Sequence, residues 1–401
     1  MNSKRIMALA ITIVMVISMA ACTSKPKAED GTGEGNEFMR DGQINMGEGG
    51  DDVEVNKTDI HMDAVEASSS GNWEAMFTPL VVEGRASDML EFDLTPTAEE
   101  QEAMKNEPFY GETILFQLLE GCSSGTSIAE HLGYYEDAGL KVEGVKSDSY
   151  VEALGTGKVQ AAVCHIATVL VPITNGVDIA IVSGAHIGCK SLYVLADSEY
   201  AGTEDLKGTA IAVPNGIGAS DYNITSLMLD DDGINPQTDV TLTQVAADAC
   251  IAAMQREEIS AALLSDVYAY SMVKDGTLKC ISSMFDSDYS DTSLCCAINM
   301  SGAFVRENPI HAKKMVQAIQ KAMCWMRENP EENAQAMLDL GLAAGDLDMN
   351  VMINNAQQFG ISDEFATANL REFVERYLRL GLITSMDDAD AVMNLAWVPV
   401  L

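Results

Sequence analysis

Hydrophobic residues along this chain fall into short runs that alternate with amphipathic segments from Thr113 onward. This alternation predicts strands of a parallel sheet wrapped by helices. Strands are expected over 114–119, 140–145, 160–164, 177–182, 209–213, 240–245, 261–264 and 278–282. Helices are expected over 127–138, 150–156, 166–174, 220–230, 248–256 and 267–274. The rhythm breaks at 191–196 and again at 295–300, so two α/β units are indicated.

After residue 300 the pattern becomes almost wholly helical. Asn308-Pro309 opens one long amphipathic run, Asn329-Pro330 opens another, and a third covers 364–378. Proline at the first helical position costs little, because the N–H that it lacks has no partner there. Residues 71–112 precede the α/β pattern and are expected to form an N-terminal extension, with a helix-like stretch over 96–105.

The first 22 residues have the order of an export signal. Lys4 and Arg5 precede an apolar run over 6–17 that is too short to span a bilayer. Met19-Ala20-Ala21-Cys22 resembles a bacterial lipobox, in which the cysteine is lipidated after the preceding peptide is removed. We therefore expect residues 1–22 to be a lipoprotein signal peptide and Cys22 to anchor the protein outside the cell. The alternative is an ordinary cleaved signal.

Composition and charge limit the kinds of binding partner that the chain can have. Residues 23–70 are polar, acidic and Gly-rich, which predicts a disordered tether between the lipid and the folded part. The net charge of −37 repels phosphate backbones, so no nucleic-acid partner is expected. It also opposes adhesion to anionic lipid, so the membrane would be reached through Cys22.

Three segments resemble one protein family. Residues 133–142 read Gly-Tyr-Tyr-Glu-Asp-Ala-Gly-Leu-Lys-Val, residues 154–162 read Leu-Gly-Thr-Gly-Lys-Val-Gln-Ala-Ala, and residues 205–213 read Asp-Leu-Lys-Gly-Thr-Ala-Ile-Ala-Val. They are similar, in order and spacing, to stretches of the nitrate/sulfonate/taurine-type periplasmic binding proteins, the group that includes NMT1/THI5-like proteins. Gln160 stands where that family usually has Asp.

The resemblance implies an α/β, two-lobe periplasmic-binding-protein fold (type II). Each lobe would be a mostly parallel sheet flanked by helices, with a helical C-terminal region. Lobe 1 would comprise 113–192 and 297–401, and lobe 2 would comprise 193–296. The breaks in the strand rhythm lie where the chain is expected to cross between the lobes. The implied function is capture of a small-molecule ligand for an ABC permease and ATPase complex, with no cofactor and no catalysis.

Ligands of such sheets bind beyond the carboxyl ends of the strands, where helix N-termini present unpaired N–H groups. This rule selects loops in both lobes. The ligand-binding candidates are Cys122, Ser123, Ser124, Thr126, Cys164, His165, His186, Cys189, Lys190, Asn215, Gly216, Gly218, Ser220 and Asp266. Lys190 could neutralise an anion or be a solvated surface charge. The serine-rich loop before Thr126 could equally be a helix cap without a ligand.

Eight cysteines follow Cys22, and an exported chain would by default form disulfides. Several of them fall at the expected ligand loops beside two histidines. Candidate metal ligands are Cys122, Cys164, His186, Cys189, Cys295 and Cys296, a set suited to a soft or borderline metal. The sequence is compatible with a metal role, a disulfide and plain packing for these cysteines.

Other functional classes compete with a receptor. A pyrimidine-synthase-like enzyme is possible within the resembling family, and a metal- or metal-complex-binding receptor would use the cysteines. The sequence contains neither the Gly-x-Ser-x-Gly motif of hydrolases nor the His-Glu-x-x-His motif of metalloproteases. A sensory lipoprotein with the same fold is the remaining alternative.

Overall fold

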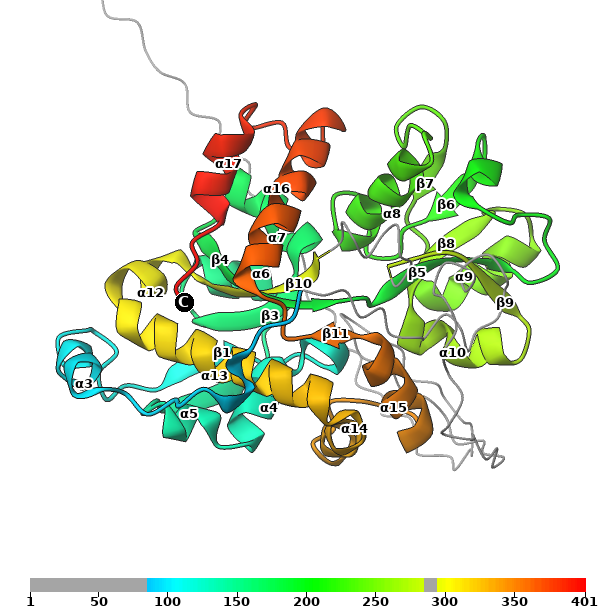
Figure 1. Cartoon of the computed structure of the whole chain (residues 1–401). Coiled ribbons are helices and arrows are strands. Elements are labelled where there is room, and N and C mark those ends of the chain that lie inside the picture. Colours follow the sequence, from blue (N-terminus) through cyan, green and yellow to red (C-terminus); the bar gives the residue numbers. More distant parts are fainter. Residues whose placement is uncertain (1–84, 285–293) are drawn as a thin grey trace, which may run out of the picture. The chain divides into compact units, whose positions relative to one another are not determined.

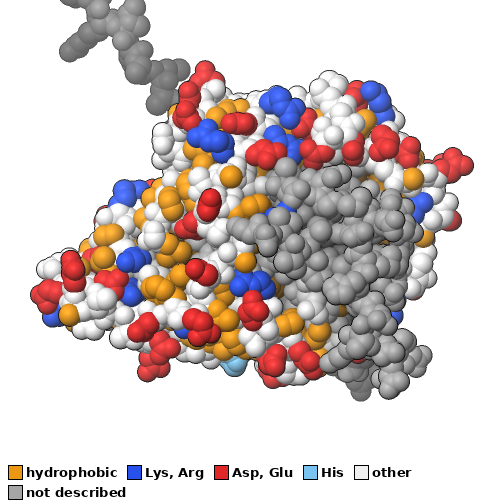
Figure 2. Space-filling model, viewed as in Figure 1, with side chains coloured by type: hydrophobic (Ala, Val, Ile, Leu, Met, Phe, Trp, Pro, Cys, Tyr) orange, Lys and Arg blue, Asp and Glu red, His pale blue; other side chains and the backbone are white. Residues whose placement is uncertain are grey.

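The structure is a computed structural model that describes residues 85–284 and 294–401 (Figure 1). The expected signal peptide (1–22) with Cys22, the tether (23–70) and the first part of the 71–112 extension lie outside the described residues. No helix among the described residues is long and apolar enough to cross a bilayer. Asp and Glu side chains are spread over the described surface visible in Figure 2, in keeping with 61 acidic against 24 basic residues in the chain.

A six-stranded sheet forms the first of two α/β lobes, and we call it with its helices lobe 1. Its strands, in spatial order, are β11 (Gln358–Phe359), β4 (Ile179–Ile187), β10 (Leu294–Ser301), β3 (Ala161–His165), β1 (Ile114–Gln117) and β2 (Val142–Val145). Strand β1 is parallel to β2 and β3. Strand β10 lies antiparallel between β3 and β4, and all three are buried along their length.

A five-stranded sheet forms lobe 2. Its strands, in spatial order, are β7 (Thr241–Thr243), β6 (Ala210–Ala212), β8 (Ala261–Ser265), β5 (Lys190–Leu195) and β9 (Leu278–Ser283). Strand β6 is parallel to its neighbours, whereas β5 is antiparallel to β8 and β9. The chain leaves lobe 1 after β4, enters lobe 2 with β5, and returns to lobe 1 with β10.

The two-lobe α/β architecture expected from the sequence is present, but both sheets are mixed rather than mostly parallel. The physical reason is the double crossing. Strand β10 enters lobe 1 at the end of the sheet where β3 and β4 finish, since Cys296 near its start pairs with both His165 and His186. A strand that starts at the end where its two neighbours finish must run antiparallel to both of them.

Helices flank both sheets (Figure 1). Those before β5 are η1 (Met89–Glu91), α3 (Ala98–Met104), η2 (Gly121–Ser123), α4 (Gly125–His131), α5 (Tyr134–Asp137), α6 (Tyr150–Gly155) and α7 (Ile166–Thr174). Lobe 2 contains η3 (Thr203–Leu206), α8 (Ser220–Asp231), α9 (Ala247–Gln255) and α10 (Asp266–Lys274). The C-terminal helices are α12 (Gly302–Glu307), α13 (Pro309–Glu328), α14 (Pro330–Asp339), α15 (Leu347–Ala356), α16 (Asp363–Arg379) and α17 (Ala389–Ala396).

One predicted helix is divided in the structure. The sequence predicted a continuous helix over 127–138, but α4 ends at His131 and α5 begins at Tyr134. Gly133 between them has a φ of +75°, a left-handed conformation that ends an α-helix and that glycine adopts without a steric penalty.

The long helix α13 packs across lobe 1 and fixes the position of β4. The Gln320 amide donates to Ser183 Oγ and to the Gly184 carbonyl, each at 2.6 Å, within a buried contact. Gly125 in α4 also approaches α13 closely, because a Cβ on that residue would lie 2.6 Å from Met323 Cε. The first turn of α4 is therefore pressed against α13, beside the loop that carries Cys122.

Polar contacts join the two lobes. Arg376 in α16 pairs with Asp231 in α8 at 2.5 Å, and Arg379 forms a bidentate pair with Asp230 at 2.6 Å. The Asn223 side chain in α8 donates to the Ala167 carbonyl of α7 at 2.8 Å. Apolar residues of α8 also belong to the main core cluster, so the lobes meet along α7, α8 and α16.

Candidate functional site

The two crossings bring cysteine and histidine side chains together from four parts of lobe 1. Two groups form, and within each group the potential ligand atoms all lie within 4.8 Å of one another. The first group is Cys122, His186 and Cys296, and the second is His165, Cys189 and Cys295. We call these six residues the sulfur–imidazole cluster. They come from η2, the end of β3, β4 and the segment after it, and β10.

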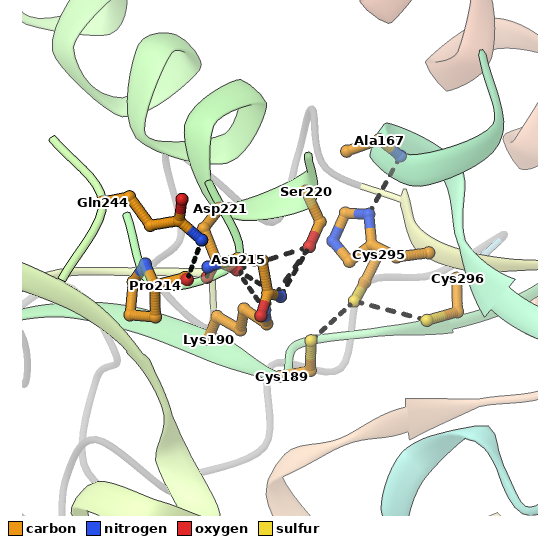
Figure 3. Close-up of polar contacts among 11 residues, drawn as sticks. Ala167, Cys189, Lys190, Pro214, Asn215, Ser220, Asp221, Gln244, Cys295 and Cys296 are labelled. Carbon is orange, nitrogen blue, oxygen red and sulfur yellow. Dashed lines mark hydrogen bonds and ion pairs between the residues drawn. The ribbon is translucent and has the colours of Figure 1, made fainter. Parts of the chain in front are cut away.

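The sulfur atoms in this cluster are close but unbonded. Cys295 Sγ lies 3.1 Å from Cys189 Sγ and 3.7 Å from Cys296 Sγ (Figure 3). Neighbours on a regular strand point to opposite faces, yet Cys295 and Cys296 both join the cluster. The pairing of β10 with β4 shifts register on both sides of Cys296, which permits this arrangement. All eight cysteines among the described residues are free thiols, so no disulfide joins them there.

The two histidines differ in what their ring nitrogens contact. His165 Nδ1 accepts a hydrogen bond from the Ala167 backbone N–H at 3.0 Å and caps α7, so the proton of the neutral ring resides on Nε2. Neither ring nitrogen of His186 has a hydrogen-bond partner among the described residues, and the side chain is fully buried. One nitrogen of the neutral His186 ring can therefore bind a ligand, while the other carries the proton.

Burial and the neighbouring thiols set the protonation of the cluster. Burial, with Lys190 and His186 nearby, holds the pKa of His165 well below its usual range, so this ring is neutral at pH 7. Burial opposes ionisation of Cys296, but hydrogen bonds from Cys122, Cys295 and Ser123 lower its pKa to about 6. Cys122, mainly, raises the pKa of Cys189 to about 12. Cys296 therefore ionises more readily than Cys189 and Cys295, whose pKa values are raised.

On the lobe 2 side of the first crossing, three of the predicted ligand-binding residues contact one buried carboxylate, that of Asp221. Lys190 forms an ion pair with Asp221, whose side chain is 2% exposed. Asn215 donates to Asp221 through its backbone N–H at 2.9 Å and through its side chain at 3.2 Å. Ser220 donates to the same carboxylate at 3.3 Å (Figure 3). We call these four residues the Lys190–Asp221 network. The sequence pattern did not indicate Asp221 as part of this group.

The Lys190–Asp221 network changes the interpretation of Lys190. Burial disfavours the charged ammonium, but Asp221 more than compensates and holds the pKa of Lys190 above its usual range. Lys190 is thus neither a solvated surface charge nor an uncompensated cation awaiting an anion. The only sequence signal for Asp221 was an acidic residue in the first turn of a helix, a position that usually serves as a solvated cap.

Other predicted site residues lie around these two groups. Ser124 and Thr126 are fully buried, and their hydroxyls have no hydrogen-bond partner among the described residues. Cys164 belongs to neither cysteine group, and its sulfur accepts from the Asn299 side chain at 3.2 Å. Gly216 and Gly218, in the loop before α8, have φ values of +93° and +81°.

Asp266, at the start of α10, is buried beside the first crossing. Its backbone N–H donates to the Cys189 carbonyl at 3.2 Å, and its carboxylate accepts from the Tyr193 hydroxyl at 2.7 Å. Burial raises the pKa of Asp266 to about 7. Its second carboxylate oxygen has no partner among the described residues.

Comparison with models of known protein families finds one match to this chain. A family model described as NMT1/THI5 like matches residues 123–333, which is more than half of the chain. The match includes both crossings and every member of the sulfur–imidazole cluster except Cys122. No curated protein matches the chain.

Comparison with solved structures identifies the fold. The alkanesulfonate-binding protein SsuA from Xanthomonas axonopodis pv. citri, bound to MOPS, superposes with a TM-score of 0.57 at 14% identity, over 71% of this chain and 97% of its own. The periplasmic nitrate-binding protein NrtA from Synechocystis PCC 6803 gives 0.57 at 16% identity, over 71% and 85%. A Candida albicans protein described as having the generic periplasmic binding protein fold gives 0.56 at 12% identity, over 71% and 95%. The predicted fold class is confirmed.

Proposed function

The chain belongs to the NMT1/THI5-like family, and we propose that it is the solute-binding protein of an ABC importer, held outside the cell by a lipid on Cys22. The observation that carries this proposal is the pair of α/β lobes joined by two crossings, in a fold shared with sulfonate- and nitrate-binding proteins. A solute that contacts both lobes favours the closed form, which a permease can then recognise. The proposal assigns no chemical step to the protein.

One of the polar contacts between the lobes is weak enough to break when the lobes separate. The Arg379–Asp230 pair joins a 59% exposed arginine to a largely buried aspartate, and pairs of this kind contribute about 0–1 kcal/mol. Little energy would therefore be lost at this point when the lobes separate. Two buried contacts hold the lobes more firmly: the hydrogen bond from Asn223 to the α7 backbone, and the pair of Arg376 with Asp231.

We place the small solute at the loop that precedes α4. Ser124 and Thr126 supply buried hydroxyls that lack protein partners among the described residues, and an unpaired buried hydroxyl lowers stability until a ligand bonds to it. Nitrate, a sulfonate, taurine or a thiamine-type pyrimidine can each bond to hydroxyls. Ser123, Gly216, Gly218 and Asp266 complete the proposed lining.

The proposed anchor rests on residues 4–22, with a charged start, an apolar stretch and Met19-Ala20-Ala21-Cys22. A diacylated cysteine would hold the protein stably despite its negative charge. Expression of the full chain and of a Cys22→Ala variant, with labelled palmitate and membrane fractionation, tests this part. Lipid labelling and membrane retention lost only in the variant would support the anchor, and labelling that persists would contradict it.

The receptor function is tested with purified protein that lacks residues 1–22. Thermal unfolding with nitrate, MOPS, taurine and a hydroxymethylpyrimidine should show a higher midpoint for one class, because a ligand that binds only the folded state stabilises it. Solution scattering with that compound should show a smaller radius of gyration.

Thr126→Val should weaken the same binding about fivefold, while Thr367→Val on the exposed face of α16 serves as the matched control. A fivefold loss corresponds to one hydrogen bond of about 1 kcal/mol. No midpoint shift with any class, together with unchanged scattering, would refute the receptor function.

A further inference from the structure

We propose that Cys122, His186 and Cys296 form a binding site for a soft or borderline metal cation, with zinc as its representative. Cys295 and Cys189 lie beside these three residues and can complete the coordination. The inference goes beyond the proposed function and does not depend on transport, because it concerns the resting protein and the metal ion alone.

The types of donor atom select this class of cation. Thiolate and imidazole ligands suit zinc and softer ions, whereas calcium and magnesium require oxygen ligands. Two sulfurs and one imidazole nitrogen lie within 4.8 Å of one another in the Cys122, His186 and Cys296 group. Zinc sites have three or four protein ligands of these same types.

The sulfur spacing fits a tetrahedral ion. With Zn–S bonds of about 2.3 Å, two thiolates on one tetrahedral zinc lie about 3.8 Å apart. Cys296 of the proposed site and its neighbour Cys295 are 3.7 Å apart, close to this value. The Cys189–Cys295 separation of 3.1 Å is shorter, so these two sulfurs would have to separate slightly to bind one ion together.

The histidines distinguish the two groups. A metal on His165 Nε2 would require the ring proton to be on Nδ1, but Nδ1 already accepts the Ala167 N–H. His165 is therefore suited to donate its Nε2 hydrogen to a metal-bound sulfur, the kind of supporting contact that tunes metal sites. His186 has no such obstacle, because neither of its nitrogens has a partner among the described residues.

Burial supports a binding role over plain packing. His186 and Cys296 are at most 2% exposed, and two unpaired imidazole nitrogens in such a place lower stability unless something bonds to them. A cation supplies that bond for one of the two nitrogens, and the other keeps the ring proton. Cys122 and Cys189 are half-buried and provide the route from solvent. On binding, Cys122 and Cys296 release any thiol protons to solvent, so that two thiolates balance the divalent charge.

The site is tested with metal-free, reduced protein lacking residues 1–22 and with Co²⁺ and Zn²⁺ as probes. Co²⁺ should give a thiolate-to-metal charge-transfer band together with the visible bands of tetrahedral cobalt, and one equivalent of Zn²⁺ should bleach both. Cys122→Ser should weaken Zn²⁺ binding in competition with a chromogenic chelator by more than about tenfold, since even the loss of a supporting contact costs that much. Zn²⁺ should also slow alkylation of Cys122 in the unaltered protein.

The matched control is Cys164→Ser, a buried cysteine adjacent to His165 in sequence but outside both groups. It should keep the cobalt spectrum and the Zn²⁺ affinity. His186→Leu gives a second, thiol-independent variant, and circular dichroism verifies that each variant is folded. Absence of the charge-transfer band in the unaltered protein, or equal loss in Cys164→Ser and Cys122→Ser, would overturn the proposal. Because no organic solute is involved, this failure is distinct from failure of the receptor function.

Discussion

The two sides of the first crossing use polar residues in opposite ways. On the lobe 2 side, Lys190, Asn215 and Ser220 all bond to Asp221, so these groups satisfy one another inside the protein. On the lobe 1 side, both nitrogens of His186 lack partners among the described residues. Groups that satisfy one another stabilise the scaffold, whereas buried groups without partners lower stability and are retained where a ligand bonds to them. The Lys190–Asp221 network is thus scaffold, and the sulfur–imidazole cluster is the candidate metal site.

The largest expected effect comes from Asp221→Ala. It leaves the Lys190 ammonium, whose side chain is only 18% exposed, without its counter-ion, and breaking such a pair costs about 3 kcal/mol or more. Urea unfolding at pH 7 measures the change. A double variant, Asp221→Leu with Lys190→Met, removes both charges and should recover most of the loss. A decrease below about 1 kcal/mol for Asp221→Ala would mean that the network is not scaffold.

The next effect is a pH dependence at Asp266. Because burial raises its pKa to about 7, the folded protein binds this proton more tightly than the unfolded chain, whose Asp has a pKa near 3.8. The stabilisation from the protonated form is therefore complete below about pH 4 and is lost as the pH rises towards 7.

Asp266→Asn removes this dependence. The stability of the variant relative to the unaltered protein should rise by at most about 1.4 kcal/mol per pH unit between pH 4 and 7, and then level off. Denaturant unfolding across pH 4–8 measures it. A difference that does not change with pH would contradict the buried, protonated carboxyl.

A smaller effect is expected at His186 in the absence of metal. His186→Leu removes no hydrogen bond to any described residue, relieves the burial of two unpaired nitrogens, and loses the ring contact with Phe359, whose centroid is 5.6 Å away. These terms nearly cancel, so the free energy of unfolding should change by less than about 1 kcal/mol with a chelator present. A loss near that of Asp221→Ala would show that the imidazole is structural.

The smallest effect on the free energy of unfolding is expected at the exposed ion pair between the lobes, Arg379 with Asp230. Arg379→Met should cost less than about 1 kcal/mol, and the cost should shrink further in high salt. Arg376→Met should cost more, because that arginine is 9% exposed and also donates to the Leu227 carbonyl. Equal costs for the two variants would show that exposure does not decide the strength of these interlobe pairs.

The sequence predicted those parts of the fold in which local signals agree with the tertiary structure. Helix α7 has the predicted bounds 166–174, and α13 and α14 begin at the prolines of the Asn-Pro pairs. The break at Gly133 was missed because the apolar positions on both sides of it continue the helical period. The antiparallel course of β10 was also missed, since strand direction depends on the return from lobe 2 and not on local pattern.

The sequence predicted many of the residues of the candidate site, but not which of them contact one another. Proximity to the ends of strands selected both Cys164 and His165, but successive side chains on a strand point to opposite faces. The structure places His165 in the sulfur–imidazole cluster and Cys164 against Asn299. The partnership of Lys190 with Asp221 joins residues 31 positions apart, and no local pattern indicates which charge a buried lysine will meet. The expected domain boundaries remain predictions.

The most direct test of the contrast between the two sides measures stabilisation by zinc in three proteins: the unaltered chain, Asp221→Asn and Cys122→Ser. At a free Zn²⁺ concentration of 100 times Kd, a ligand that binds only the folded state adds about 2.7 kcal/mol to the free energy of unfolding. We predict that increment in the unaltered protein and in Asp221→Asn, which starts from lower stability, and no more than about 1.4 kcal/mol in Cys122→Ser, whose affinity is at least about tenfold weaker. An equal increment in all three, or none in the unaltered protein, would contradict the account.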